Sequence, residues 1–182
     1  YQVTELMRTR LLMIAARTQT GLARRGDARD LTNELRLTLE RTVRVLEEIA
    51  GELAVRFEQQ PSASELYADV ARSVMPRLGD LHEVVHGLGF MAEVGVLPEV
   101  PYWMEWWQRA SDGAFDRDYT HQLDASRDDF YEYGSKGYMV QPRETGEPSA
   151  MGPYIDHGGV GEAIITVSVP VMPVDGETAR TF

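Results

Sequence analysis

The chain has 182 residues, of which 43% are hydrophobic, and it carries a formal net charge of −11 and no cysteine. This length suggests one domain, or one domain with a helical extension, and the apolar fraction is ample for a packed core. The acidic charge disfavours contact with the phosphate backbone of nucleic acids. The lack of cysteine excludes disulfides and cysteine-ligated zinc.

The first 30 residues differ in charge from the rest. They carry six arginines against three acidic residues, whereas the remainder carries 12 basic and 26 acidic residues. We interpret residues 1–30 as an N-terminal helical extension and residues 31–182 as the main domain. A helix is expected over 5–22, and arginines on such a helix are typical of a solvated face, although a nearby membrane surface would also suit them. No stretch of the sequence approaches the roughly 20 apolar residues of a membrane span.

A long helix is predicted over residues 31–59, because apolar residues recur there at spacings of three and four. This stripe consists of Leu31, Leu35, Leu39, Val43, Leu46, Ile49, Leu53 and Phe57. Ser62 followed by Glu65 forms a capping box that opens a shorter helix, which we expect to reach about Met75, where Pro76 ends it.

The middle of the chain predicts strands and turns. Residues 87–96 are apolar with few charges and predict a strand, and the aromatic run over 102–107 predicts another strand or a short helix. Residues 110–127 are rich in Asp, Arg and Ser and are expected to be mostly loop, with a possible short strand at 119–123.

The C-terminal third predicts a hairpin. Residues 163–171 are rich in β-branched residues and bounded by Gly and Pro, as is typical of a strand, and residues 154–156 would pair with them across a glycine-rich turn. Residues 131–149, with their prolines and glycines, are expected to be a loop. Asp175-Gly176-Glu177 has the composition of a further turn, but too few residues follow for the closing strand expected below.

This hairpin and the tyrosines before it resemble the Cache family, the PAS-like domains that sense ligands. The resemblance rests on the run from Asp129 through Pro153-Tyr154-Ile155-Asp156 to the strand ending at Val171, with weaker likeness in the segments 87–92 and 102–107. It covers roughly residues 33–171. It implies a mixed α+β fold in which a PAS-like antiparallel sheet is flanked by a long N-terminal helix and shorter helices.

The resemblance also implies a ligand pocket. Amino-acid-sensing Cache domains carry Tyr-x4-Arg-x-Trp-Tyr followed by Tyr-x-Asp, in which the Arg holds a carboxylate and the Asp an ammonium group. The matching positions here, three of them altered in type, are Tyr131, Lys136, Tyr138, Met139, Tyr154 and Asp156. We add Tyr133 as a neighbour in the same cluster, and Trp106 as a cavity wall from the tryptophan-rich segment. The alternative is that Lys136 is an exposed loop residue and Asp156 a turn residue before Gly158.

The altered positions change the expected ligand. Lysine holds a carboxylate as a point charge and cannot offer the planar fork of arginine. Without the tryptophan the pocket also loses a cation-binding aromatic face. We therefore expect a small polar metabolite, an organic acid or amino-acid-like compound, rather than a standard amino acid.

A second motif predicts different chemistry. His82-Glu83-Val84-Val85-His86 is an HExxH sequence, which on a helix places two histidines where they can bind zinc beside a glutamate base. Ala92 stands where the longer metalloprotease motif has its third histidine, and an apolar strand-like run follows at once. The alternative is that both histidines lie near a helix C-terminus, where the dipole favours an imidazolium.

These observations predict a non-catalytic sensor domain of a bacterial signal-transduction or regulatory protein, without a cofactor. The resemblance implies a homodimer formed through the long helix, an effector domain outside this chain and a location on the outer side of the cell membrane, with a cytoplasmic regulator as the other possibility. The alternatives are a zinc-dependent hydrolase built on His82, Glu83 and His86, and a dimerisation module that binds no ligand.

Overall fold

The computed structural model describes residues 25–59, 61–79, 81, 85–109, 114–117, 121–155 and 163–172. The helix expected over 5–22, the residues beyond 172 and Asp156 lie outside these ranges. The described chain has the mixed α+β composition that the sequence predicts. Its elements are α2 (Arg25–Phe57), α3 (Ala63–Leu78), β1 (Gly87–Met91), β2 (Met104–Arg109), β3 (Phe115–Arg117), α4 (Gly137–Thr145), β4 (Ser149–Ile155) and β5 (Ala163–Ser168).

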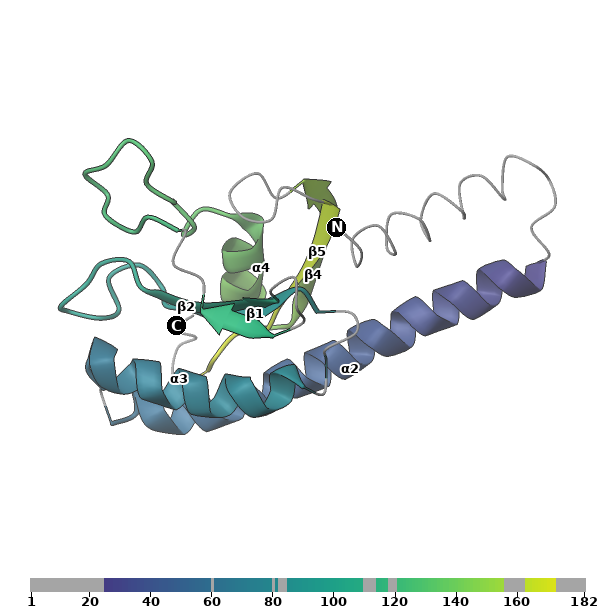
Figure 1. Cartoon of the computed structure of the whole chain (residues 1–182), viewed down its shortest axis with the longest axis horizontal. Helices are drawn as coiled ribbons and strands as arrows, with labels where there is room; N and C mark the ends of the chain where they lie inside the picture. The colour runs from purple at the N-terminus through teal and green to yellow at the C-terminus, as the bar shows by residue number, and fades with distance from the viewer. Residues whose placement is uncertain are drawn as a thin grey trace.

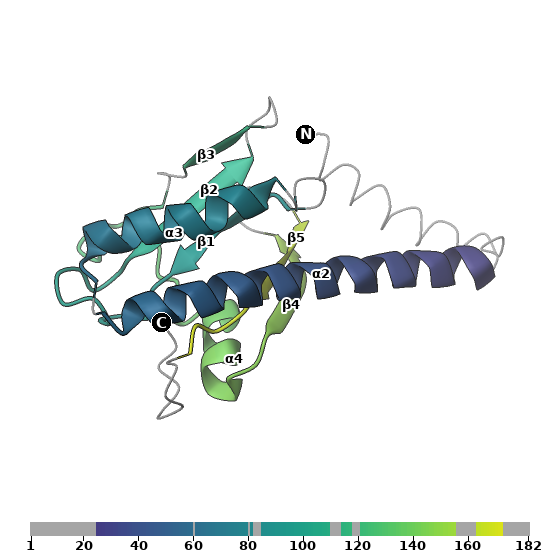
Figure 2. The ribbon, with the colours of Figure 1, turned by 90° about the horizontal axis from the view of Figure 1, so that it is seen from below.

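Helices α2 and α3 lie side by side and form one layer of the molecule (Figures 1 and 2). The capping box is confirmed: Ser62 Oγ accepts from the Glu65 N–H at 3.4 Å, and Glu65 Oε2 accepts from the Ser62 N–H at 2.9 Å. The prediction that Pro76 ends α3 is wrong, because the helix continues to Leu78. Pro76 lies in the last turn, where the ring removes a single intrahelical donor.

The first sheet has the order β1-β2-β3, and all its pairs are antiparallel. The strand predicted over 87–96 is confirmed only as far as Met91, since residues 92–96 turn around Gly95 with its φ of 79°. The aromatic run 102–107 is a strand rather than a helix, but only from Met104 onward. The sequence analysis missed β3 in what was expected to be loop. Of the segment 119–123, the structure describes residues 121–123, among which Gln122 forms an isolated bridge to Phe130.

One face of this sheet packs on the two helices and forms the core. Leu88, Phe90 and Trp107 alternate with half-buried neighbours along β1 and β2, as a strand with one buried face requires. The rings of Phe57 and Phe90 lie 5.5 Å apart across the layer. The core is completed mainly by aliphatic residues of the helices: Ile49, Ala50, Leu53, Ala54, Leu66, Val70, Val74 and Leu78.

The predicted C-terminal hairpin is confirmed as the antiparallel pair β4-β5, with an irregularity between Met151 and Tyr154. The loop expected before it is wrong in part, because residues 137–145 form α4. This helix begins at a glycine and contains Pro142, and it lacks an apolar stripe, so nothing in its sequence pattern indicates a helix. It ends at Gly146, whose φ of 69° is the left-handed conformation that glycine favours.

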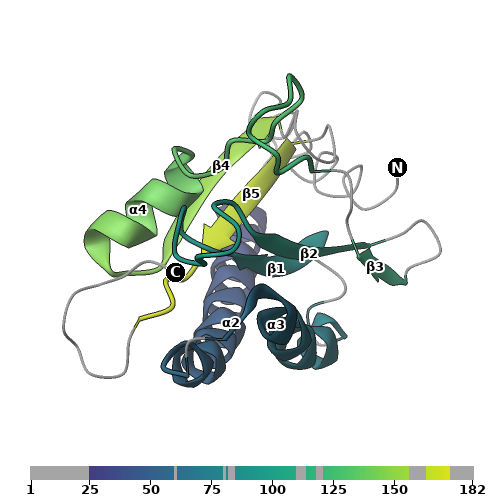
Figure 3. The same ribbon diagram turned by 90° about the vertical axis from the view of Figure 1, so that its left-hand side faces the viewer.

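The strands are divided between two sheets, whereas the resemblance implied one continuous sheet. Figure 3 shows the hairpin β4-β5 rising at an angle from the level of β1 and β2, with α4 along its outer side. The hairpin contacts α2 through β5 and α4 through both strands. Within the described ranges, no helix is both long enough and apolar enough to cross a membrane.

Candidate functional site

A cavity of about 310 Å³ lies between the first sheet, the hairpin β4-β5, α4 and the middle of α2. On the sheet, its lining is mostly the face of β1 and β2 opposite to the core, and it also reaches core residues such as Leu53, Leu88 and Phe90. Its lining includes Leu39, Leu46, Met91, Met104, Trp106, Tyr131, Tyr138, Met139, Tyr154, Ile164 and Thr166.

Trp106 forms part of the cavity wall on the sheet side. Its register partner on β1 is Gly89, and Gly87 lies two residues away on the same face. A Cβ added at Gly87 would lie 2.5 Å from the indole Nε1, and one added at Gly89 would lie 2.8 Å from the indole Cε3. The indole therefore rests on strand β1 where two side chains are missing, a cross-strand packing of an aromatic ring over edge glycines.

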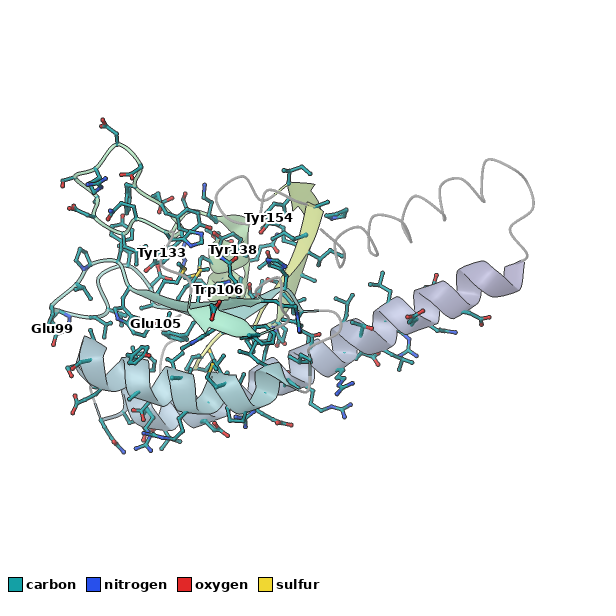
Figure 4. The ribbon with its side chains drawn as sticks, in the orientation of Figure 1. Glu99, Glu105, Trp106, Tyr133, Tyr138 and Tyr154 are labelled. Atoms are coloured by element: carbon teal, nitrogen blue, oxygen red, sulfur yellow. The ribbon has the colours of Figure 1, made fainter. Side chains whose placement is uncertain are left out.

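The opposite wall carries two tyrosines whose hydroxyl groups are hydrogen-bonded to each other. Tyr131 Oη and Tyr138 Oη lie 2.7 Å apart, and either can donate. The ring of His121 packs against Tyr131 with 4.2 Å between centroids. Figure 4 shows Trp106 and Tyr138 on the same side of β2, with Glu105 on the other side, toward α3.

Helix α4, which supplies Tyr138 and Met139, is tied to the first sheet. Arg143 Nη1 donates to Glu93 Oε1 at 2.6 Å, so the helix is linked to the turn that follows β1. Its buried residues are Tyr138, Met139 and Pro142, and all three line the cavity. The third wall is β5, where Thr166 Oγ1 is hydrogen-bonded to the hydroxyl of Tyr154 at 2.5 Å.

Side chains without a permanent charge supply the polar groups of the described cavity lining. Among the lining residues that the structure describes, none is Asp, Glu, Lys or Arg. The polar members are Thr38, Thr42, His86, Gln108, His121, Tyr131, Tyr138, Tyr154, Thr166 and Ser168. This described lining offers hydrogen bonds but no permanently charged side chain, and the groups in it that can take up a positive charge are the imidazoles of His86 and His121.

The structure brings together Trp106, Tyr131, Tyr138 and Tyr154 from the residues that sequence reasoning selected, and Met139 beside them. It does not bring Lys136 to the cavity. Lys136 is exposed and occupies the N-cap position of α4, where its backbone carbonyl accepts from the N–H groups of Met139 and Val140. This agrees with the alternative that Lys136 is an exposed residue.

Tyr133 also lies away from the cavity lining, and its role is structural. The side chain is fully buried, and its hydroxyl accepts from the Trp103 N–H at 2.9 Å and donates to the Ala92 carbonyl at 2.8 Å. These bonds join the end of β1 to the start of β2. Burial away from water raises the pKa of Tyr133 to about 12, because the phenolate form is poorly solvated there.

The HExxH motif falls mostly outside the described residues, which include His86 but not His82 or Glu83. His86 lines the cavity, and strand β1 begins at the next residue. The described ranges contain no group of three or more His, Asp or Glu residues arranged to hold a metal ion.

Sequence reasoning missed several lining residues. Gly87 and Gly89 could have been identified from the sequence. Glycines at alternate positions of a strand leave one face without side chains, and a large ring from the neighbouring strand, here Trp106, can pack there. His121 and Gln108 gave none, because only the folded chain brings them to the cavity.

Comparison of the chain with protein-family models, with curated proteins and with solved structures finds no match.

Proposed function

We propose that this domain binds a small, largely apolar and uncharged molecule in the cavity between its two sheets, and that it acts as a non-catalytic sensor. The observation that carries the proposal is the cavity itself: about 310 Å³, with apolar and aromatic walls and a few neutral hydrogen-bonding groups. Sites for small molecules have this make-up and begin at about this size.

This proposal departs from the expected organic acid or amino acid. Such a ligand would place a carboxylate in a described lining where only His86 and His121 can carry a positive charge, and an ion buried without a counter-charge is strongly disfavoured. A neutral molecule with one or two hydrogen-bonding atoms can bond to threonine, glutamine and tyrosine side chains without the free-energy cost of burying an ion.

Helix α2 supports the sensor part of the proposal. Leu39, Thr42 and Leu46 line the cavity, and Leu53 is a core residue on the same helix. If α2 can take two positions relative to the sheets, a ligand that binds one of them more tightly would increase the population of molecules in that position. The effector that responds, and a homodimer formed through α2, belong to the same proposal, as does a location outside the cytoplasmic membrane.

A thermal-shift screen of the purified chain tests the proposal. The panel holds neutral apolar compounds, organic acids, amino acids and zinc chloride, each at several concentrations. A ligand present at 100 times its dissociation constant stabilises the folded state by about 2.7 kcal/mol, which raises Tm by about 5–10 °C in a chain of this size. We expect the neutral compounds alone to reach this effect.

Two neighbouring residues of α2 provide the variant and its control. Thr38 lines the cavity, whereas Leu37 does not line it and is 56% exposed. Thr38→Trp should fill part of the cavity and reduce the ligand-induced shift, and Leu37→Trp should leave the shift intact. A response to organic acids alone would contradict the neutral ligand, and a response to zinc alone would favour the HExxH hydrolase. A dimer that shows no shift with any compound would favour the dimerisation module.

A further inference from the structure

We propose, on the basis of the function proposed above, that the ligand is a flat, unsaturated ring compound. Its ring would lie face to face with the indole of Trp106, and a hydrogen-bonding atom on its rim would meet the hydroxyl pair of Tyr131 and Tyr138. This names the ligand class of the cavity, which the cavity volume and polarity alone leave open.

The position of the Trp106 ring determines which of its faces a ligand can reach. Its side toward β1 is covered by the backbone at Gly87 and Gly89, where even a methyl group would collide with it. Since Trp106 also lines the cavity, the face turned away from the glycines is the one that a ligand can reach. Flat contact with two glycines holds the indole in one orientation, so the surface it offers is planar before any ligand binds.

The other two tryptophans provide an internal contrast. Trp103 is 9% exposed and Trp107 is 4% exposed, and both are members of the core cluster, with neighbouring rings around them. Trp106 is only half-buried and is not a member of the core cluster. Of the three indoles, it is the one whose surroundings leave room for a ring that the chain does not itself supply.

Methionine sulfurs lie on the same side of the sheet. Met91 and Met104 are direct partners across β1 and β2, and both line the cavity. Sulfur near the edge of an aromatic ring makes a favourable contact, and methionine adapts its shape to the ring it meets. An aromatic ring stacked on Trp106 would therefore have the sulfur atoms of Met91 and Met104 at its edge. A saturated ring of the same size would bind less tightly, because it makes no sulfur–aromatic contact.

The hydroxyl pair sets the polar requirement on the ligand. A phenolic hydroxyl can both donate and accept, so the bonded pair Tyr131–Tyr138 can serve a ligand that offers either a donor or an acceptor. Neither group carries a charge, and Tyr138 is held in place by its burial in α4. The pair favours a hydroxyl, carbonyl or ring nitrogen at the rim of the ligand.

Three probe compounds of nearly equal size separate these contributions. They are 2-naphthol, its saturated counterpart decahydro-2-naphthol, and naphthalene, with affinities measured by titration calorimetry. Ring stacking adds enough free energy beyond burial for about 2- to 12-fold in affinity, so wild-type protein should bind 2-naphthol tighter than decahydro-2-naphthol by that factor. Equal or tighter binding of the saturated alcohol would overturn the proposal while leaving the cavity function intact.

Substitutions then assign the preference to particular residues. Trp106→Leu should still bind the saturated alcohol but lose the preference for 2-naphthol. Tyr67→Leu is the control, because Tyr67 is an aromatic residue outside the cavity lining that stacks on Trp107. Tyr138→Phe should weaken 2-naphthol toward the affinity of naphthalene and leave naphthalene itself unchanged. A preference that survives in Trp106→Leu contradicts the stacking.

A measurement on the wild-type chain covers the case in which Trp106→Leu does not fold. The three indole N–H groups give three resonances in a ¹⁵N–¹H NMR spectrum. Ring stacking should move the resonance of Trp106 far more than those of Trp103 and Trp107. Binding that leaves the Trp106 resonance in place would overturn the inference, and failure of every probe to bind would overturn both this inference and the function on which it rests.

Discussion

The two faces of strands β1 and β2 are built from different residues and serve different ends. On the face toward α2 and α3, Leu88 and Phe90 are at most 7% exposed and belong to the hydrophobic core cluster, although both also line part of the cavity. On the opposite face, Gly87 and Gly89 support Trp106, and a cavity remains. Because successive side chains of a strand point to opposite faces of the sheet, about ten residues form both faces. Residues on one face can therefore be substituted without altering the side chains on the other.

The comparison indicates where stability and binding are located in this molecule. The core side excludes water and fills its volume, which is the arrangement that stabilises a domain. The cavity side leaves volume unfilled and keeps aromatic surface half-exposed, which lowers stability unless a ligand occupies it. Substitutions on the two faces should therefore affect different measurements.

The largest effect is expected in the core. Leu66 on α3 is fully buried, and Leu66→Ala should lower the free energy of unfolding by about 2–5 kcal/mol through lost burial and the cavity left behind. Met104→Ala, on the cavity face, should cost less than half as much. Urea denaturation measures both, and equal losses would mean that the two faces contribute alike to stability.

Tyr133 connects the two strands, and its loss should be felt next. Tyr133→Phe leaves the Trp103 N–H and the Ala92 carbonyl without this partner inside the protein, at a cost of about 1–3 kcal/mol. The substitution should also change the response to alkali. Unfolded tyrosine loses its proton near pH 10, whereas the pKa of folded Tyr133 is raised to about 12.

The sign of that pH dependence follows from proton binding. Between pH 10 and 12 the folded chain keeps the Tyr133 proton and the unfolded chain has lost it, so stability falls as pH rises, by about 1.4 kcal/mol per pH unit. Below pH 10 this contribution is fully present. Tyr133→Phe should lack this part of the decline, as urea titrations at pH 9, 10 and 11 can show. An unchanged slope in the variant would assign the decline to other groups.

Two glycine substitutions of opposite sign sharpen the contrast further. Gly89→Ala should destabilise by about 1–3 kcal/mol, since its Cβ would collide with the backbone of Glu105 and the ring of Trp106. Gly51→Ala, in the exposed interior of α2 with nothing within 4 Å of the added Cβ, should stabilise by about 0.5–1 kcal/mol. Thermal unfolding distinguishes the two directions, and a neutral Gly89→Ala would refute the close contact of Trp106 with β1.

The smallest loss of stability is expected at a helix end remote from both faces of the sheet. Ser62→Ala removes the cap of α3 and should cost about 1 kcal/mol. The loss should leave ligand affinity unchanged, because Ser62 does not line the cavity. A changed affinity in this variant would show that stability of α3 and binding are coupled after all.

The sequence predicts the regular parts of this fold well, because each carries a local signal. The apolar stripe of α2, the Ser62–Glu65 capping box and the β-branched run of β5 are all found where expected. Helix α4 carries no such signal, since Gly137 and Pro142 favour a loop and its packing against the hairpin overrides them.

The candidate site is less predictable, because its walls come from segments far apart in the chain. Thr42, Trp106 and Tyr138 meet only after the two sheets and α2 have taken their places. Lys136 and Tyr133 were selected because they are close in sequence to Tyr131 and Tyr138, which line the cavity. In the folded chain, Lys136 is exposed to solvent, and Tyr133 is buried at the junction of β1 and β2. Side-chain direction, which decides such cases, is fixed by tertiary packing.

Helix α2 has a geometry with a mechanical consequence. Its 33 residues span about 50 Å, with the C-terminal part clamped in the core and the described part of the first turns exposed beyond the sheets (Figure 2). The cavity lining on this helix runs from Leu35 to Leu53, so it covers the middle of the helix and reaches into the clamped part. The helix therefore has the form of a lever arm: a 5° tilt about the clamp displaces the far end by about 3–4 Å, over the length that remains, while the cavity wall moves less, and least at its end near Leu53.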